Sequence, residues 1–408
     1  MSYDAKTGSF EKMKSLNQST VLNMIRIKEP ISRAEIAKLT KLTPPTVSSL
    51  VSELIEKNLI TEEQAPSSKA GGRKPFMLRI NYSAHYIIGI YAAAEVIRVI
   101  LTTMDGRIVT DYHKDIIELP SRDKFVNMIK DSIYQLLDNA QIDRGLILGI
   151  GFAMHGLVDH AQGLAIFSPH LHLENIPLKE ILEKEFNIPV SVENDVRALA
   201  IGESWFGQGK GISDFVCISV GRGIGSGIFI NNEIYRSSFH TAGEIGHTIL
   251  DRNGPKCQCG NNGCLEAYAS ESAIINHADT ELKNGTDSIL REWTKDNANT
   301  LSIDLIFKAA NNGDKMAIQI LEEAGNSLGL AAANMINILK PSKLIVEGKI
   351  FEDGDHVLNP LKEMIENYTF KSSNEQISVV RSTLRKTGMV LGAVTLVLQK
   401  IFTTEEWK

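Results

Sequence analysis

A cluster of three cysteines and one histidine constrains the fold of this chain more than any other feature of its sequence. Nine, one and four residues separate, in turn, His247, Cys257, Cys259 and Cys264. Three thiolates and one imidazole form a common ligand set for a closed tetrahedral zinc site. Pro255 and nearby glycines supply the tight turns that such a site needs. The spacing predicts a structural zinc, and the alternative is a group of free buried thiols beside an unrelated histidine.

Length and composition predict a multidomain protein of the cytoplasm. The chain has 408 residues, of which 43% are hydrophobic, which is enough for two or three cores. The N-terminus lacks an apolar run of signal-peptide length, and no stretch approaches eighteen uncharged apolar residues, so we expect no membrane insertion. A Cys-x-Cys cluster beside a histidine fits a reducing compartment better than a disulfide scaffold.

Charge is distributed unevenly along the chain. Residues 1–82 contain 13 Lys and Arg against 8 Asp and Glu, a net charge of +5. The remaining residues carry 30 against 41, a net charge of −11. A basic end on an acidic body indicates an anionic partner for that end alone, or else a solvated basic tail.

Apolar periodicity predicts three short helices before residue 60. Ser32 is the expected cap of the second helix, which runs through Ile36, Ala37 and Leu39; Thr43, followed by two prolines, is the expected cap of the third. The turn between them, residues 40–43, is as short as in a helix-turn-helix, whose last helix reads base edges with its N-terminal residues. The residues predicted to contact DNA from this helix are Thr43, Thr46, Ser48 and Ser49.

A small β wing is predicted after the third helix. Residues 59–61 and 76–78 can pair as strands around the loop at 67–75. Arg73 and Lys74 in that loop can enter a minor groove or bind phosphates, although an ordinary flexible basic linker has the same composition. Residues 1–82 are therefore predicted to form a winged helix-turn-helix domain that binds double-stranded operator DNA.

The segment SRAEIAKLTKLTPPTVSSLVSELIEKNLI, followed by GGRKP, resembles the DNA-binding domain of ROK-family transcriptional regulators. The resemblance extends from about Lys12 to Phe402. Within the family, the chain resembles the group that contains xylose and N-acetylglucosamine repressors. It implies a winged helix joined to a two-lobed, actin-like and ribonuclease-H-like α/β body that binds a sugar. We expect a first lobe over residues 83–196 and 389–408 and a second lobe, with the zinc site, over 197–388.

The order of elements after residue 86 fits such a body. Strands are predicted at 87–90 and 96–102, with a hairpin turn at 104–107, followed by a helix at 123–137 and a strand at 147–152. This alternation is typical of a layered α/β domain. Helices at 303–311 and 315–339 are expected to serve packing or dimerisation, and the last helix, 388–401, to return to the first lobe.

The nucleotide motif of the related sugar kinases is altered here. The kinases have approximately Gly-Ile-Asp-Ile-Gly-Gly-Thr where this chain has Gly89 to Glu95. A carboxylate that helps to hold magnesium is replaced by Tyr91, two phosphate-facing glycines are replaced by Ala93 and Ala94, and Glu95 adds a negative charge. Glu347 stands where the kinases have a glycine pair beside adenosine. We therefore expect no catalysis.

A glycine-rich hairpin at 220–227 lies between two apolar strands. Its exposed amides could bind phosphate, and a purely structural turn is the alternative.

The residues that match the family's sugar site are better preserved than the nucleotide motif. By resemblance to ROK kinases, Asp195 matches the general base and is vestigial here; a surface Asn-Asp turn is the alternative. The residues that match the family's sugar contacts are Asn194, Asp195, Glu244, His247 and Glu266.

These features together predict a sugar-responsive transcriptional repressor with a structural zinc ion. We expect a sugar or sugar phosphate as effector and a homodimer, or a dimer of dimers, on operator DNA. One alternative is an ATP-dependent ROK sugar kinase with an accessory DNA-binding head. Another is a repressor controlled by a protein partner. In the predicted repressor, zinc fixes the loop that carries Glu244, His247 and Glu266, so that His247 faces both the metal and the sugar.

Overall fold

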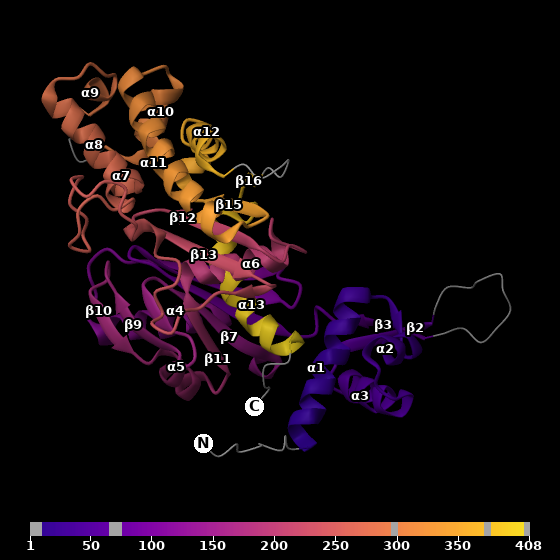
Figure 1. Cartoon of the computed structure of the whole chain (residues 1–408). Helices are drawn as coiled ribbons and strands as arrows, with labels where there is room; N and C mark the ends of the chain where they lie inside the picture. Colours follow the sequence, from indigo (N-terminus) through magenta and orange to yellow (C-terminus); the bar gives the residue numbers. More distant parts are fainter. Residues whose placement is uncertain (1–9, 65–75, 295–300, 371–376, 404–408) are drawn as a thin grey trace, which may run out of the picture. The chain divides into compact units, whose positions relative to one another are not determined.

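The computed structural model describes residues 10–64, 76–294, 301–370 and 377–403, which form two compact units (Figure 1). The first unit consists of Met1–Asn194 and Ala393–Lys408, and the second of Asp195–Gly392. The predicted wing residues Arg73 and Lys74 lie outside the described residues. No helix in the described part of the chain is long and apolar enough to span a membrane.

The first unit begins with a winged helix-turn-helix, which we call the head (Figure 1). Its helices are α1 (Phe10–Lys28), α2 (Arg33–Thr40) and α3 (Pro44–Glu56). Strands β1 (Ile31–Ser32), β2 (Ile60–Gln64) and β3 (Phe76–Ile80) form an antiparallel sheet in the order β1-β3-β2. The predicted pairing of the wing strands is confirmed, and β3 also pairs with β1, which was not predicted.

The helix caps of the head confirm the sequence prediction. Ser32 and Glu35 form a reciprocal capping box at the start of α2. Thr43 caps α3 by accepting a hydrogen bond from the Thr46 amide. Leu39 was assigned to the apolar face of α2, but it is 51% exposed, because the final turn of this eight-residue helix projects beyond the core.

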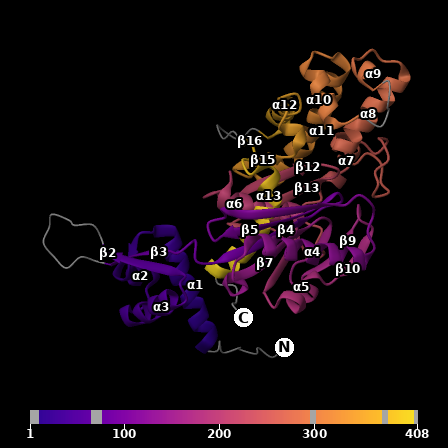
Figure 2. The same ribbon diagram turned by 180° about the vertical axis from the view of Figure 1, so that it is seen from behind.

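The rest of the first unit is an α/β lobe built on a five-stranded sheet. The sheet order is β11-β7-β4-β5-β6, and β4 lies parallel to β7 and antiparallel to β5. The strands are β4 (Tyr86–Ala92), β5 (Val96–Thr103), β6 (Ile108–Asp115), β7 (Ile147–Met154) and β11 (Val190–Asn194). Figure 2 shows β4, β5 and β7 side by side from behind.

Helices and a small second sheet complete this lobe. Helix α4 (Arg122–Ala140) packs on β5 and β6, and α5 (Leu178–Phe186) packs on β11. The small sheet has the order β10-β9-β8, from β8 (Leu157–Asp159), β9 (Leu164–Ser168) and β10 (Leu173–Ile176). Gly151 of β7 allows the C-terminal helix to approach closely, since a Cβ atom there would lie 1.8 Å from the Ala393 carbonyl oxygen.

The second unit contains another five-stranded sheet, in the order β14-β13-β12-β15-β16. Its strands are β12 (Phe215–Val220), β13 (Ile224–Ile230), β14 (Glu233–Ile234), β15 (Lys343–Glu347) and β16 (Ser378–Arg381). Its helices are α6 (Asp195–Phe206), α7 (Glu266–Ala269), α8 (Glu271–Asn284), α9 (Leu290–Trp293), α10 (Ile303–Asn311), α11 (Lys315–Leu339) and α12 (Leu358–Tyr368). Helix α13 (Gly388–Phe402) begins in this unit and ends in the first.

A cluster of buried apolar residues joins this sheet to the long helix α11. Gly325 and Gly329 let α11 approach α12, since a Cβ atom at either position would lie less than 3.0 Å from backbone or side-chain atoms of α12 and the residue before it. The predicted helices at 303–311 and 315–339 are confirmed, and their buried residues belong to the core of this unit. A role in dimerisation stays a prediction.

Candidate functional site

The histidine and the three cysteines predicted to bind zinc come together in the second unit. One ligand atom from each of the four residues lies within 4.8 Å of the other three. His247 Nδ1 is 3.7 Å from Cys257 Sγ, and Cys259 Sγ is 3.6 Å from Cys264 Sγ. Tetrahedral zinc with Zn–S bonds of 2.3 Å would hold its sulfur ligands about 3.8 Å apart. The four residues therefore fit a metal ion of zinc's size and preference.

Backbone turns bring these ligands together. The Cys257 amide donates to the Asn261 carbonyl at 2.8 Å, and the Gly263 amide donates to the Pro255 carbonyl at 2.8 Å. Gly263 has a φ of 71°, and a Cβ atom there would lie 1.5 Å from the Asp251 carbonyl oxygen. Only glycine meets both conditions, so the loop is built for close packing around the thiols.

The electrostatic environment of the thiols favours a cation. Burial and the hydrogen bonds from neighbouring thiols raise the pKa of Cys264 to about 12. Cys264 is completely buried and Cys257 is 4% exposed. Three thiolates cannot coexist at this distance without a positive charge between them, so metal binding would release protons.

Three of the predicted sugar residues lie near one another in the second unit, beside the metal cluster. Glu244 precedes the short 3₁₀ turn Ile245–His247, His247 ends that turn, and Glu266 begins α7. Burial raises the pKa of the Glu244 carboxyl. The charges of His247 and Arg197 lower this pKa, whereas those of Asp195 and Glu266 raise it. Each of these charges is therefore close enough to act on the Glu244 carboxyl. Asp195, at the start of α6, is 3% exposed.

Glu266 connects the metal cluster to the glycine-rich hairpin. Its Oε1 atom is 3.8 Å from Cys257 Sγ, and its Oε2 atom accepts a hydrogen bond of 3.1 Å from the Ile224 amide. One carboxylate thus fixes the start of β13 relative to the cysteine loop. The predicted hairpin is confirmed, with Val220 ending β12 and Ile224 opening β13.

Asn194 is the last residue of the first unit, where β11 ends beside β7. Its Nδ2 atom donates to the Gly156 carbonyl at 3.0 Å, which orients the amide. The predicted change from strand to helix between Asn194 and Asp195 is confirmed. The roles of Asn194 and Asp195 in sugar binding stay predictions.

Glu347 lies at the end of β15, opposite Ser219 of β12. The Ser219 hydroxyl donates to Glu347 Oε2 at 2.7 Å. Burial raises the pKa of this carboxyl to about 7, and Glu352, Asp195 and Glu271 add to the increase. The neighbouring backbone is tight, because Gly348 has a φ of 128° and its missing Cβ atom would lie 2.0 Å from the Val220 carbonyl oxygen.

The raised pKa of Glu347 predicts a pH-dependent gain from its amide isostere. The folded state holds the proton more tightly than the unfolded chain, so Glu347 stabilises the fold below about pH 4.5, and this contribution is lost as the pH rises through 7. Glu347→Gln should match the wild type at pH 4.5 and exceed its free energy of unfolding by ~2–3 kcal/mol at pH 8.5. Urea unfolding at both pH values measures this difference.

Glu322→Gln, at an exposed position of α11, is the matched control and should change stability equally at both pH values. An equal effect of Glu347→Gln at the two pH values would contradict the assigned pKa.

In the head, α3 presents the hydroxyl side chains that sequence analysis assigned to DNA. Ser48 and Ser49 are exposed, whereas Thr46 is half-buried. The Thr43 hydroxyl is 2.8 Å from the Thr46 hydroxyl and also caps the helix, so it has a structural role in addition to any contact with DNA. Arg33 of α2 makes hydrogen bonds of 2.9 and 3.0 Å to the two carboxylate oxygens of Glu62 in β2. This pair fixes the wing strand against the helix-turn-helix.

Family models match both parts of the chain. The ROK family model matches residues 87–400, and a MarR family model matches residues 15–70. The chain belongs to the ROK family. It is similar to the xylose repressor of Caldicellulosiruptor bescii, with 32% identity over 98% of this chain and 100% of that protein. It is also similar to the N-acetylglucosamine repressor of Escherichia coli O157:H7, with 31% identity over 96% and 95% of the two chains.

Solved structures agree with this assignment. A crystal structure of a ROK family transcriptional regulator, described as a homologue of the E. coli MLC protein, has a TM-score of 0.86 and 27% identity, and covers 97% of this chain and 98% of its own. A ROK family glucokinase from Streptomyces griseus, in complex with glucose and AMPPNP, has a TM-score of 0.68 and 27% identity over 76% of this chain and 98% of its own. This ROK protein therefore combines the body found in sugar kinases with the organisation of transcriptional regulators.

One buried arginine and one ion pair of this ROK protein were not predicted from the sequence. Arg197 is 3% exposed in the first turn of α6, and its guanidinium donates to the His240 carbonyl at 3.1 Å. Most of α6 is buried, so helical periodicity does not single out Arg197. The Arg33–Glu62 pair joins residues 29 positions apart, and no local pattern predicts it.

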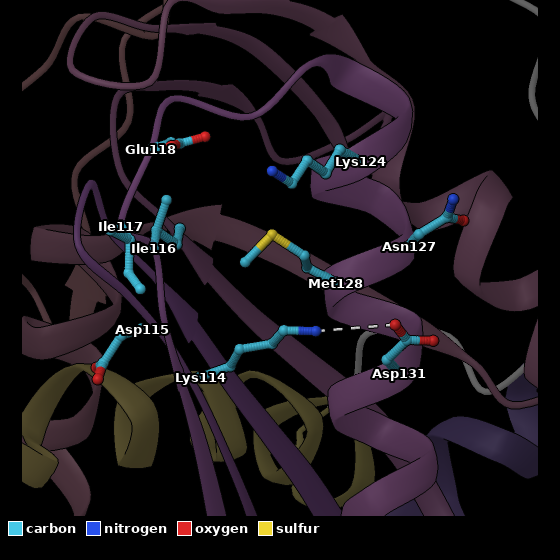
Figure 3. Close-up of a pocket in the computed structure, with 9 residues that line it drawn as sticks. All are labelled: Lys114, Asp115, Ile116, Ile117, Glu118, Lys124, Asn127, Met128 and Asp131. Atoms are coloured by element: carbon cyan, nitrogen blue, oxygen red, sulfur yellow. Dashed lines mark ion pairs between the residues drawn. The ribbon is translucent and has the colours of Figure 1, made fainter.

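A hollow of about 680 Å³ lies on the first unit between α4 and the chain that follows β6 (Figure 3). Figure 3 shows Lys114 and Asp131 facing each other across it at 3.8 Å. Ile117 at its edge is 94% exposed. None of the residues predicted to bind sugar, metal or DNA lines this hollow.

Proposed function

We propose that this ROK protein is a sugar-responsive transcriptional repressor. The observation that carries the proposal is the presence of a winged helix-turn-helix and a ROK body in one chain that is similar over its whole length to two sugar repressors. The head binds operator DNA through α3 and through Arg73 and Lys74 of the wing. The body binds a sugar or a sugar phosphate, and that binding changes the affinity for the operator.

Asn194, Asp195, Glu244, His247 and Glu266 form the proposed effector site. The proposal is supported by the electrostatic influence of Asp195, His247 and Glu266 on the Glu244 carboxyl within the second unit. Carboxylate oxygens accept hydrogen bonds from sugar hydroxyls, and an imidazole can donate or accept one. A ring of hydroxyls suits this set better than an apolar ligand does.

Zinc is proposed as the metal of the His247, Cys257, Cys259 and Cys264 cluster. The residues present fit zinc by ligand type and by separation. The ion would supply a fixed tetrahedral crosslink, with no open position for chemistry. His247 directs Nδ1 toward the thiols, which leaves Nε2 for a sugar hydroxyl.

We favour a ROK body that binds a sugar but has no kinase activity. Tyr91, Ala93, Ala94 and Glu95 stand at the kinase phosphate motif, which weakens magnesium and phosphate binding there. Glu347 adds a carboxyl on the second unit beside the hairpin that would face the nucleotide. Asp195 remains as the matching general base, so an ATP-dependent sugar kinase is the second candidate.

Replacing Asp195 tests both candidates. Asp195→Asn should leave operator affinity in the absence of sugar unchanged and should raise the effector concentration for half-release by roughly 10- to 100-fold, because a buried carboxylate acceptor is lost. Fluorescence anisotropy with labelled operator, titrated with pentoses, hexoses, amino sugars and their phosphates, measures this. A thermal-shift screen selects the sugar, since a ligand of the folded state raises its melting temperature.

The same sugars are then tested with ATP and magnesium in a coupled kinase assay. Turnover at ordinary kinase rates that Asp195→Asn abolishes would contradict a pure repressor. Operator binding that no sugar affects, but that a protein from the cell releases, would favour control by a protein partner.

Dimers, or dimers of dimers, are proposed because paired heads read paired half-sites.

A further inference from the structure

A cavity of about 300 Å³ lies within the first unit, where the head meets the α/β lobe. Its apolar walls come from α1 with Leu22, α3 with Leu54, the following Leu59, β7 with Leu148, and α13 with Ile401. Leu22, Leu54, Leu59 and Ile401 are each at most 5% exposed. This volume lies at the lower end of the range for small-molecule sites.

Two polar atoms at this cavity have no hydrogen-bond partner among the described residues. They are Gln18 Nε2 of α1 and His85 Nδ1, and both atoms are buried. A buried polar group without a partner costs about 1–3 kcal/mol, so two in one cavity need an explanation. A ligand that supplied both partners would remove this cost.

The hydrogen bond on the far side of the His85 ring decides what its free nitrogen needs. His85 Nε2 is 3.0 Å from the Lys57 carbonyl oxygen, which can only accept a hydrogen bond. Nε2 therefore donates, and in this tautomer Nδ1 is the acceptor nitrogen of the ring. Gln18 Nε2 is a donor. The cavity thus offers one donor and one acceptor on an otherwise apolar surface.

We propose that this cavity binds a small uncharged molecule with an apolar body and one group that both donates and accepts a hydrogen bond, such as a primary amide or a hydroxyl. The group accepts from Gln18 Nε2 and donates to His85 Nδ1. The apolar body contacts the leucine and isoleucine walls, which would otherwise surround poorly hydrated space.

The position of the cavity suits a regulatory ligand. Leu54 lies on the buried face of α3, and the exposed face of the same helix carries Ser48 and Ser49. Leu148 lies in β7, the strand that pairs with β11 as far as Asn194. Binding itself does not depend on the proposed function, whereas an effect of the ligand on operator affinity rests on it.

Benzamide is a suitable probe, because its amide both donates and accepts and its ring is apolar. Titration of the full chain by calorimetry should give saturable binding, and toluene, which lacks the amide, should bind more weakly. Gln18→Leu and His85→Leu should each weaken benzamide binding by about tenfold and leave toluene binding unchanged. Gln319→Leu, the same change at an exposed position of α11, should alter neither.

A second measurement uses the unaltered protein. The side-chain amide resonance of Gln18, assigned by its loss in Gln18→Leu, should shift when benzamide or benzyl alcohol is added. Failure of both compounds to bind or to shift this resonance would overturn the proposal and leave the cavity to water. Equal binding of benzamide to the wild type and to both leucine variants would overturn it as well.

Discussion

A Cys264→Ser variant is expected to lose its bound zinc and to melt well below the wild type. Cys264 is completely buried, with its Sγ atom 3.6 Å from Cys259 Sγ, so a hydroxyl there removes one of four ligands at the centre of the cluster. With free zinc at 1,000 times its Kd, binding contributes about 4 kcal/mol to the folded state. For a unit of this size the loss lowers Tm by roughly 8–15 °C.

The metal content and the melting curve are measured on the same preparation. Zinc per chain should fall from near one to near zero, and a chelator should lower the Tm of the wild type but not of the variant. Cys217→Ser is the matched control, since Cys217 is a buried cysteine of β12 outside the cluster. That variant should keep its zinc. A Cys264→Ser protein with full zinc content and an unchanged Tm would exclude the proposed metal site.

Loss of zinc should also reduce the response to sugar. Glu266 contacts both Cys257 and the Ile224 amide, and His247 belongs to the cluster while lying beside Glu244. Without the metal these side chains lose their fixed positions. If a Cys257→Ser protein responded to the effector as the wild type does, the zinc would be purely structural.

Local patterns predicted most of the head and the metal cluster. The Ser32 capping box and the prolines after Thr43 act within four residues, so they fix helix starts whatever the rest of the chain does. The three cysteines are close in sequence, and the short turns between them keep their sulfur atoms close together. The hairpin between Val220 and Ile224 is equally local.

Contacts between distant segments could not be read in this way. The order of the first sheet places β7 beside β4, although two strands and a helix intervene in the sequence. The hydrogen bond from Ser219 to Glu347 joins residues 128 positions apart. The pKa of Glu347 is raised by burial, which likewise depends on segments distant in sequence. Leu39 shows the converse, because an apolar residue at helical spacing is exposed where the helix outruns its core.

Some residues of the proposed effector site could be predicted from the sequence and others could not. The resemblance to ROK proteins identified Asp195, Glu244, His247 and Glu266, and the second unit brings the other three residues close enough to Glu244 to shift the pKa of its carboxyl. Arg197 also acts on the Glu244 carboxyl. Its position depends on a contact with the His240 carbonyl, and the sequence gives no sign of that contact. The cavity at Gln18 and His85 is lined by five segments of the first unit that are distant in sequence, so no local pattern predicts it.

Ser49→Glu is expected to weaken operator binding by roughly 100-fold at physiological salt without a loss of stability. Ser49 is exposed in the second turn of α3 and makes no contribution to the core of the head, which uses Val47, Leu50 and Leu54. A carboxylate on the face that we propose approaches DNA would be repelled by the phosphates and could not make the contacts of a small hydroxyl. Stability should hold because substitutions of exposed residues that contact no core usually change it by less than about 0.5 kcal/mol.

Anisotropy with an operator selected by the wild-type protein from random DNA measures the change, and Asn326→Glu at an exposed position of α11 is the control of equal charge. The control should bind as the wild type does, because the added charge lies in the second unit. Arg73→Ala should weaken binding less and should reduce the slope of log affinity against log salt by about one, as expected for one lost phosphate contact. Equal effects of Ser49→Glu and Asn326→Glu would mean that net charge, and not the exposed face of α3, governs binding to DNA.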